Sequence, residues 1–317
     1  MKGLYHLCYT SHSEVICRNR NDYGRLICRI AQTSVSTSSQ ILAYAVMSTH
    51  VHLILLTDSP SSFCRRLRHS YTSSFNCKYS RKGTLGDKYF FCRELKHIEH
   101  ITAAISYVLR NPVHHNVAVN PFSYPYSTVG LYFRSSMERT FQECGYEDSE
   151  SFPRRIQSDS GRLYRKREYL KGNVAFLDTG EVDPSSFVEI SMVENYFGTY
   201  NAFQYNLHRR DYQEWARSQM EADKEEPPVT IRNIEPWMEQ KQIEAFEKKS
   251  SRWNKEEQIS DMELCAEIDS EVQRLRKSSY VHLSHEDKMA ISTKIRMRHS
   301  ESNITSEQFA RCFGGWE

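Results

Sequence analysis

Two histidines separated by one residue form the first group in this chain that could do chemistry. His50-Val51-His52 lies at the start of an apolar run that favours a β-strand, and a strand turns residues i and i+2 to the same face. Two imidazoles on one face can bind one divalent metal ion and leave positions for substrate oxygens, as metal-assisted phosphoryl chemistry requires. A second interpretation stays open, in which both histidines are exposed or one is hydrogen-bonded in the core.

A tyrosine and an asparagine form the second group. Tyr107 and Asn111 fall in a segment with helical apolar spacing, and one helical turn separates them. At 100° per residue, Tyr107 lies about 180° from the apolar Ile98, so the phenol and the amide share the polar side of the helix. The alternative is an exposed tyrosine followed by an Asn that ends the helix.

The surrounding periodicities predict the elements that must position these groups. Alternating or β-favouring runs predict strands over Gly3–Thr10, Ile41–Met47, Val51–Leu56 and Tyr89–Phe91. Helical spacing predicts helices over Asp22–Ala31, around Phe63–Phe75 and over His97–Asn111, with Pro112 ending the last. The order indicates an α+β protein with a ferredoxin-like βαββαβ sheet, helices on one face and the other face free for a ligand.

Composition excludes several classes of protein. The 317 residues are 39% hydrophobic and 26% charged, and no apolar run approaches the ~20 residues of a membrane span. Because the first residues lack the apolar stretch of a secretory signal, we expect a cytoplasmic location and no membrane partner. The nine cysteines include no C-x-x-C pair, so we expect reduced thiols and neither a disulfide framework nor a zinc ribbon.

Charge separates the chain into unlike parts. Residues 1–140 carry 17 Lys and Arg against 7 Asp and Glu, whereas residues 141–317 carry 25 against 33. We therefore expect polyanion binding to be concentrated in a first domain over 1–140, although charge alone leaves the ligand open. A helical accessory region with linkers over 141–225 and a helical C-terminal domain over 226–317 follow it. The expected contacts of the first domain with a polyanion are Arg65, Arg66, Arg68, Lys78, Arg81 and Arg110. A merely solvated basic face is the alternative.

The C-terminal domain contains two helix-start signals. Ser284 and Thr305 are each followed by the acidic or amide residue of a capping box, which predicts two short helices around a turn. Such a pair is typical of a helix-turn-helix, with Arg311 near DNA phosphates. A helical hairpin that packs on the first domain or mediates dimerisation is the alternative.

Four segments in chain order carry a family resemblance. They are Tyr5-His6, Met47-Ser48-Thr49-His50-Val51-His52-Leu53, Tyr71-Thr72-Ser73-Ser74-Phe75-Asn76-Cys77-Lys78-Tyr79 and Tyr107-Val108-Leu109-Arg110-Asn111-Pro112-Val113. Over about residues 1–133 the chain resembles the single-tyrosine HUH transposases, in particular the REP-associated tyrosine transposase branch. It departs from the family pattern at Thr49, where Asn is usual, at Asp87-Lys88-Tyr89-Phe90, and at His114-His115-Asn116 in place of Arg-Ala-Gly.

The resemblance implies a transposase that cleaves and rejoins single-stranded DNA beside a hairpin. Tyr107 would be the nucleophile, and His50, His52 and Asn111 would hold one Mg²⁺ or Mn²⁺. The products would be a 5′-phosphotyrosine and a free 3′-OH, with no nucleotide cofactor. Whether the protein forms a homodimer is left open.

Two other functions compete with this one. A domesticated, sequence-specific DNA-binding regulator would keep the fold and bind DNA without a covalent adduct. A metal hydrolase would use His50 and His52 without Tyr107 and would release its product.

Overall fold

A four-stranded antiparallel sheet lies at the centre of the first domain. The computed structural model describes residues 2–143, 174–177, 180–209, 212–236, 238, 259–300 and 302–316. The sheet is formed by β1 (Gly3–Thr10), β2 (Gln40–Val46), β3 (His50–Thr57) and β4 (Phe91–Glu94), in the order β2-β3-β1-β4. This is the ferredoxin-like order, so the predicted α+β class is confirmed.

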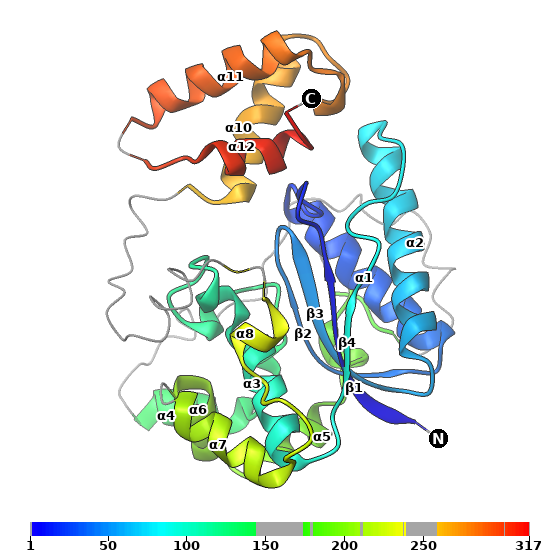
Figure 1. Ribbon diagram of the computed structural model, residues 1–317, viewed down its shortest axis with the longest axis vertical. Coiled ribbons are helices and arrows are strands. Elements are labelled where there is room, and N and C mark those ends of the chain that lie inside the picture. The colour runs from blue at the N-terminus through cyan, green and yellow to red at the C-terminus, as the bar shows by residue number, and fades with distance from the viewer. Residues whose placement is uncertain are drawn as a thin grey trace.

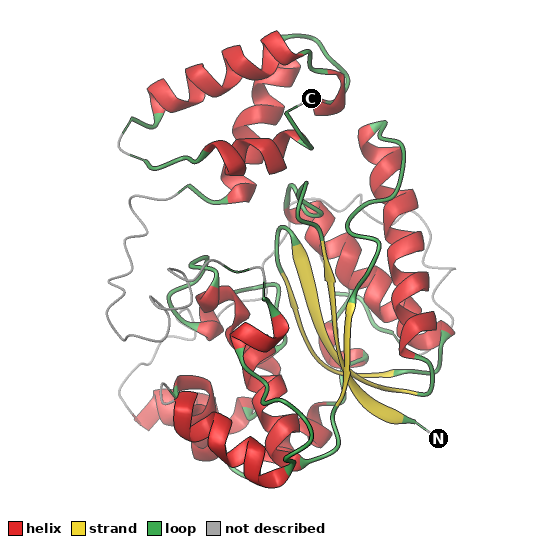
Figure 2. Ribbon diagram, in the orientation of Figure 1, coloured by secondary structure: helices red, strands yellow, loops and turns green. Residues whose placement is uncertain are grey.

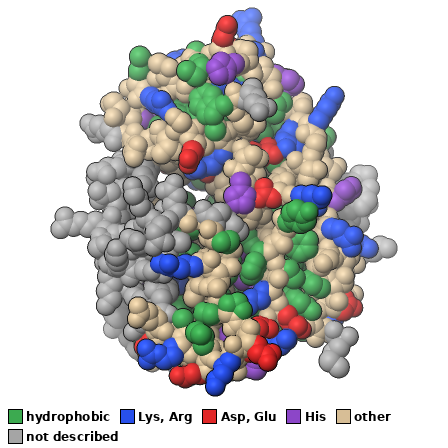
Figure 3. All heavy atoms as spheres, viewed as in Figure 1, with side chains coloured by type: hydrophobic (Ala, Val, Ile, Leu, Met, Phe, Trp, Pro, Cys, Tyr) green, Lys and Arg blue, Asp and Glu red, His purple; other side chains and the backbone are tan. Residues whose placement is uncertain are grey.

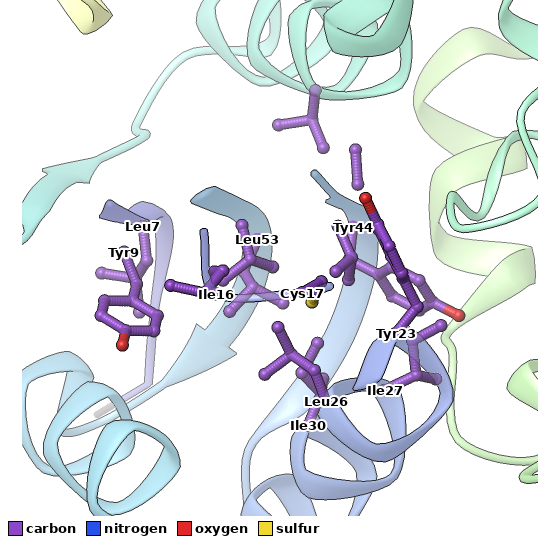
Figure 4. Packing of buried hydrophobic residues seen from close by; sticks show 14 of the residues in the cluster. Leu7, Tyr9, Ile16, Cys17, Tyr23, Leu26, Ile27, Ile30, Tyr44 and Leu53 are labelled. Atoms are coloured by element: carbon purple, nitrogen blue, oxygen red, sulfur yellow. The ribbon is translucent and has the colours of Figure 1, made fainter. Parts of the chain in front are cut away.

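Two helices cover one face of the sheet (Figures 1 and 2). They are α1 (Arg20–Ser36) and α2 (Pro60–Tyr79), which contact each other and the strands. Apolar side chains recur along α1 at helical spacing and point at the sheet. Figure 4 shows this packing, with Tyr23, Leu26, Ile27 and Ile30 of α1 beside Tyr44 and Leu53 of the strands. The buried layer fixes the strand register, and with it the face to which each histidine points.

The opposite face is covered as well, contrary to the expectation of a face left free for a ligand. The helix α3 (Ile98–His114) packs across β2 and β3. It is in turn contacted by α5 (Ile190–Phe197), α6 (Tyr200–His208) and α7 (Tyr212–Ala222). The predicted ligand face is therefore the buried boundary between the sheet and α3.

The predicted end of α3 at Pro112 is wrong. Pro112 lacks an N–H and leaves one helical carbonyl without its usual donor, yet the helix continues to His114. The amide of His115 donates to the carbonyl of Asn111 at 3.1 Å, and Val117 donates to that of Pro112 at 2.9 Å. These bonds hold the last turn, and they place His115 one turn beyond Asn111 on the same side.

The region after the sheet domain is helical and short-segmented. Its helices include α4 (Arg134–Glu143) and α8 (Ile231–Ile234), and the chain reverses at Gly198, which has φ 72° and ends α5. Short 3₁₀ turns lie at Pro121–Ser123, Val129–Leu131, Pro184–Ser186 and Tyr280–His282. The domain limits at 140 and 225 stay predictions.

Three C-terminal helices form a separate bundle, visible in Figure 1 beyond the end of the sheet. They are α10 (Asp261–Arg274), α11 (His285–Arg298) and α12 (Ser306–Phe313). As the capping signals predict, Ser284 accepts the amide of Asp287 and Thr305 accepts that of Gln308. Because Phe309 and Phe313 of α12 are buried, much of this helix faces the protein core.

A fully buried arginine ties this bundle to the first domain. Arg18 donates to the carbonyl of Cys312 and, at 2.6 Å, to Asp269, while its guanidinium lies 3.7 Å from the centre of the Tyr280 ring. Nearby, Ser48 donates to Asp261 at 2.7 Å. The bundle therefore meets the sheet domain at the loop that precedes β3.

Two further sequence expectations concern the whole chain. No helix among the described residues is long and apolar enough to cross a membrane. The eight described cysteines are all free.

Replacing Arg18 by Met should destabilise the protein by about 2–3 kcal/mol, because Met keeps the length but removes two charge-assisted hydrogen bonds from a buried position. Urea unfolding followed by circular dichroism measures the loss. The matched control is Arg25→Met on α1, where the side chain is only partly buried and donates to Ser74; it should change stability by about 0.5 kcal/mol or less. Equal losses of stability in the two variants would contradict the conclusion that Arg18 holds the C-terminal bundle to the first domain.

Candidate active site

The structure brings the histidines of β3 and the polar side of α3 into one cluster. His50 Nε2 lies 2.8 Å from Asn111 Oδ1, and the His52 and Tyr107 rings are 5.4 Å apart at nearly right angles. All four side chains are buried, Tyr107 being only 4% exposed. The strand pleat and the helical turn thus place together the four residues that the sequence singles out.

A carboxylate from a distant segment lies at the centre of this cluster. Glu235 Oε1 accepts hydrogen bonds from the Tyr107 hydroxyl and, at 3.0 Å, from the Asn111 amide, and it lies 3.1 Å from His52 Nε2. Glu235 is fully buried. It follows directly after α8, whose Ile231 and Ile234 are buried and anchor it.

His115 approaches the same carboxylate from the end of α3. Its Nε2 lies 3.0 Å from Glu235 Oε2, and its ring is 4.6 Å from that of His50. His50, His115 and Glu235 each offer one ligand atom, and these atoms lie within 4.8 Å of one another. The three residues form a group that could bind a metal ion.

Strand β1 supports the cluster from beneath. His6 Nε2 lies 3.1 Å from His52 Nδ1, and Cys8 Sγ lies 3.7 Å from His52 Nε2. Cys8 is the register partner of His52 across the sheet. Because neighbours face both nitrogens of His52, the orientation of its ring is fixed.

Burial and charge set the protonation states. Burial, together with the neighbouring His115, lowers the pKa of His50 to about 3, so His50 is neutral near pH 7 and can act as a ligand. Burial and the Glu235 carboxylate raise the pKa of Tyr107 well above its ordinary value. Burial alone would raise the pKa of Glu235, but His115, His52 and His50 outweigh it and hold that pKa well below the usual range. The site therefore contains a carboxylate and a protonated phenol.

Most of the basic residues expected to contact DNA bind other parts of the chain. Of the seven, Arg65, Arg66 and Lys78 are exposed on the surface, and Lys78 is paired with an acidic side chain. The intramolecular hydrogen-bond partners are the carbonyls of Asp87 and Lys88 for Arg68, Asp22 for Lys78, Glu14 for Arg81, the carbonyl of Arg209 for Arg110, and Asp261 for Arg311. On the face shown in Figure 3, Lys and Arg side chains are interspersed with Asp and Glu.

Arg65 and Arg66 line a groove between α1 and α2. Arg29 and His69 line it as well, together with hydroxyl and amide side chains, and none of the residues described along it is acidic. We call it the basic groove. It lies on the face of the sheet that α1 and α2 cover, opposite the face that α3 covers.

Sequence reasoning missed two residues of the cluster. His115 would have been found by extending the helix through Pro112, since it follows Asn111 by four residues. Glu235 has no such signal, because it is a single acidic residue 128 positions from Tyr107 in an unremarkable Ile-Glu-Pro segment.

The fold and the site define an α+β protein with a Tyr, His, His and Asn cluster between its sheet and one helix. No protein-family model and no curated protein matches the chain. One similar solved structure is a REP-associated tyrosine transposase bound to a REP hairpin, with 19% identity, a TM-score of 0.36, and coverage of 44% of this chain and 82% of that chain. Another is a candidate transposase from Deinococcus radiodurans R1, with 18% identity, a TM-score of 0.28, and coverage of 35% and 91%.

Acid should destabilise the metal-free protein. Burial lowers the pKa values of His6, His50 and His114 below 6.5, so the unfolded chain binds more protons as the pH falls below about 6.5. Each histidine then removes up to about 1.4 kcal/mol of stability per pH unit. Above about pH 7.5 this contribution should be constant.

Chemical unfolding between pH 8 and pH 5 in the presence of a chelator measures the dependence. His6→Asn removes one of the titrating groups, so its stability should fall less steeply below pH 6.5 than that of the wild type. Identical slopes for the two proteins would show that His6 is not buried in its neutral form.

Proposed function

We propose that this protein cleaves and rejoins single-stranded DNA through a covalent bond to Tyr107. The proposal is carried by one observation: the Tyr107 hydroxyl lies in the same buried cluster as His50, His52 and Asn111. The motif resemblance adds the substrate, which is single-stranded DNA beside a hairpin, and the transposase class.

The reaction is a transesterification at one phosphodiester. The Tyr107 oxygen attacks phosphorus and loses its proton, the bond from phosphorus to the 3′ oxygen breaks, and that oxygen takes up a proton. The products are a 5′-phosphotyrosine and a free 3′-OH. Because one ester replaces another, a 3′-OH can reverse the step without a nucleotide cofactor.

The residues present are suited to a divalent metal ion. His50, His52 and Asn111 are the ligands that the family resemblance implies, and neutral imidazole and amide oxygen are acceptable donors to such an ion. When bound, Mg²⁺ or Mn²⁺ would polarise the scissile phosphate and stabilise the developing negative charge. The chain itself orients the phenol, through the helix α3, and the imidazoles, through the strand β3.

Substrate access requires a rearrangement at Tyr107. A reacting phosphorus must come within about 3–3.5 Å of the nucleophilic oxygen. Glu235 Oε1 now holds that hydroxyl by a hydrogen bond and helps to bury it. The carboxylate must therefore leave the hydroxyl before DNA can react there.

The basic groove is the surface that we propose for the DNA backbone away from the scissile bond. Arginine guanidinium groups pair well with phosphate oxygens, and the groove also offers hydroxyl donors. Its position on the opposite side of the sheet from Tyr107 means that DNA would wrap around the domain edge to reach both.

Tyr107→Phe should abolish the covalent adduct while leaving DNA binding intact, because the change removes one oxygen and keeps the ring in its packing. The measurement is a denaturing gel of protein with 3′-end-labelled single-stranded hairpin DNA and Mn²⁺ or Mg²⁺, followed by peptide mapping of the adduct. Tyr89→Phe, at a 78% exposed ring, is the control and should form the adduct normally.

Nucleotide recovered on another tyrosine would overturn the assignment of Tyr107. If the wild type binds hairpin DNA but forms no adduct with either Mn²⁺ or Mg²⁺, the result would instead favour a DNA-binding regulator.

The double variant Arg65→Ala, Arg66→Ala should weaken single-stranded DNA binding and lower its salt dependence. Each lost phosphate contact reduces the slope of log K against log salt by about 0.7, so two contacts give about 1.4. Fluorescence anisotropy at several salt concentrations measures the slope. Arg217→Ala, an exposed arginine of α7, is the matched control. An unchanged slope in the double variant would remove the basic groove from the DNA path.

A further inference from the structure

We propose that Glu235 and His115 are metal ligands and that, with His50, they bind a first-row transition dication. This inference deepens the proposed function, on which it rests for the role of the ion in catalysis. It adds two ligands that lie outside the four motif segments. One comes from the turn beyond Pro112 and the other from the residue after α8.

The three ligand atoms are already nearly in place. They lie within 4.8 Å of one another, and bonds of about 2.1 Å to one ion put any two ligand atoms at most about 4.2 Å apart. Three ligands spread around one ion at that bond length lie about 3–3.6 Å apart, so a contraction of roughly 1–2 Å at the longest separation would bring all three into contact with the ion. Burial of His50 and Glu235 keeps bulk water from competing for the site.

Two buried atoms of this group have no hydrogen-bond partner among the described residues. Glu235 Oε2 and His115 Nε2 lie 3.0 Å apart, yet neither atom makes a hydrogen bond of acceptable geometry. Such groups are rare in folded proteins, and a metal ion bound between the two atoms would explain them. A metal ion bound by both residues would accept one lone pair from Glu235 Oε2 and one from His115 Nε2. An ion pair between the two side chains in this geometry leaves those lone pairs unused.

The donor set selects the class of ion. Two imidazoles and one carboxylate suit first-row transition dications, whereas Mg²⁺ prefers oxygen ligands and gives up its water reluctantly. The carboxylate also supplies the negative charge that a set of only His50, His52 and Asn111 lacks. We therefore expect Mn²⁺ to bind more tightly than Mg²⁺.

Hydrogen bonds also hold the Glu235 carboxylate in place. Glu235 Oε1, the other oxygen of the carboxylate, accepts from Asn111 and Tyr107, which holds Oε2 towards His115. Hydrogen-bonded ligands of this kind are typical of protein metal sites.

The test is metal binding by the full-length chain without DNA. Protein freed of metal by a chelator is titrated with MnCl₂, and bound Mn²⁺ is measured by calorimetry and by loss of the free-ion signal in electron paramagnetic resonance. Glu235→Gln and His115→Gln should each weaken Mn²⁺ binding by tenfold or more. Their matched controls are Glu225→Gln on the preceding loop and His69→Gln on α2, both exposed, which should bind Mn²⁺ as the wild type does.

Circular dichroism and thermal melting establish that each variant is folded. If Glu235→Gln does not fold, His115→Gln decides the question, because its side chain is partly exposed at a helix end. Wild-type Mn²⁺ affinity in a folded Glu235→Gln or His115→Gln protein overturns the proposal. Wild-type affinity combined with faster adduct formation in Glu235→Gln also overturns it and makes Glu235 a block on Tyr107.

Failure of the metal proposal and failure of the proposed function are distinguishable. Tyr107→Phe removes one hydrogen bond to Glu235 Oε1 but no ligand atom, so it should lose the adduct entirely and weaken Mn²⁺ binding less than Glu235→Gln does. If the wild type binds Mn²⁺ through Glu235 and His115 but forms no adduct with DNA, the ligand assignment stands and the transesterase proposal fails.

Discussion

A single buried carboxylate determines how this site is organised. Removing an ionised Glu from water is unfavourable by several kcal/mol unless donors surround it. Glu235 Oε1 meets that condition because α3 and β3 bring Tyr107, Asn111 and His52 to one point, and His115 Nε2 lies 3.0 Å from Oε2. The positions of the sheet, of α3 and of the segment after α8 are therefore mutually dependent.

The strand and the helix contribute different kinds of precision. The buried apolar layer under α1 and α2 fixes strand register, and a slip of one residue would turn both histidines away from α3. The helix contributes spacing, because residues four apart stand one above the other. The last turn of α3, which persists beyond Pro112, extends that row from Asn111 to His115. A local departure from the usual behaviour of proline thereby enlarges the site.

The sequence predicts the sheet well and the site in part. Strand alternation and helical spacing are local signals, so they predict the ferredoxin-like order and the pairing of His50-Val51-His52 with Tyr107 and Asn111. Features that depend on tertiary contacts cannot be predicted from these local sequence signals. The covering of the second face depends on contacts between distant segments. Glu235 is the extreme case, because a lone Glu in a polar chain has no periodicity to mark it.

The wide separation of the cluster along the chain has a consequence for synthesis on the ribosome. His6, His52 and Asn111 all belong to the domain that emerges first, and Glu235 follows Asn111 by more than a hundred residues. At about 5–20 residues per second, roughly 6–25 s pass before the carboxylate emerges. During that interval the nascent domain has imidazoles and a phenol without the anion that later lies among them. A chaperone or a cellular metal ion would meet this uncompleted centre before the finished chain encloses it.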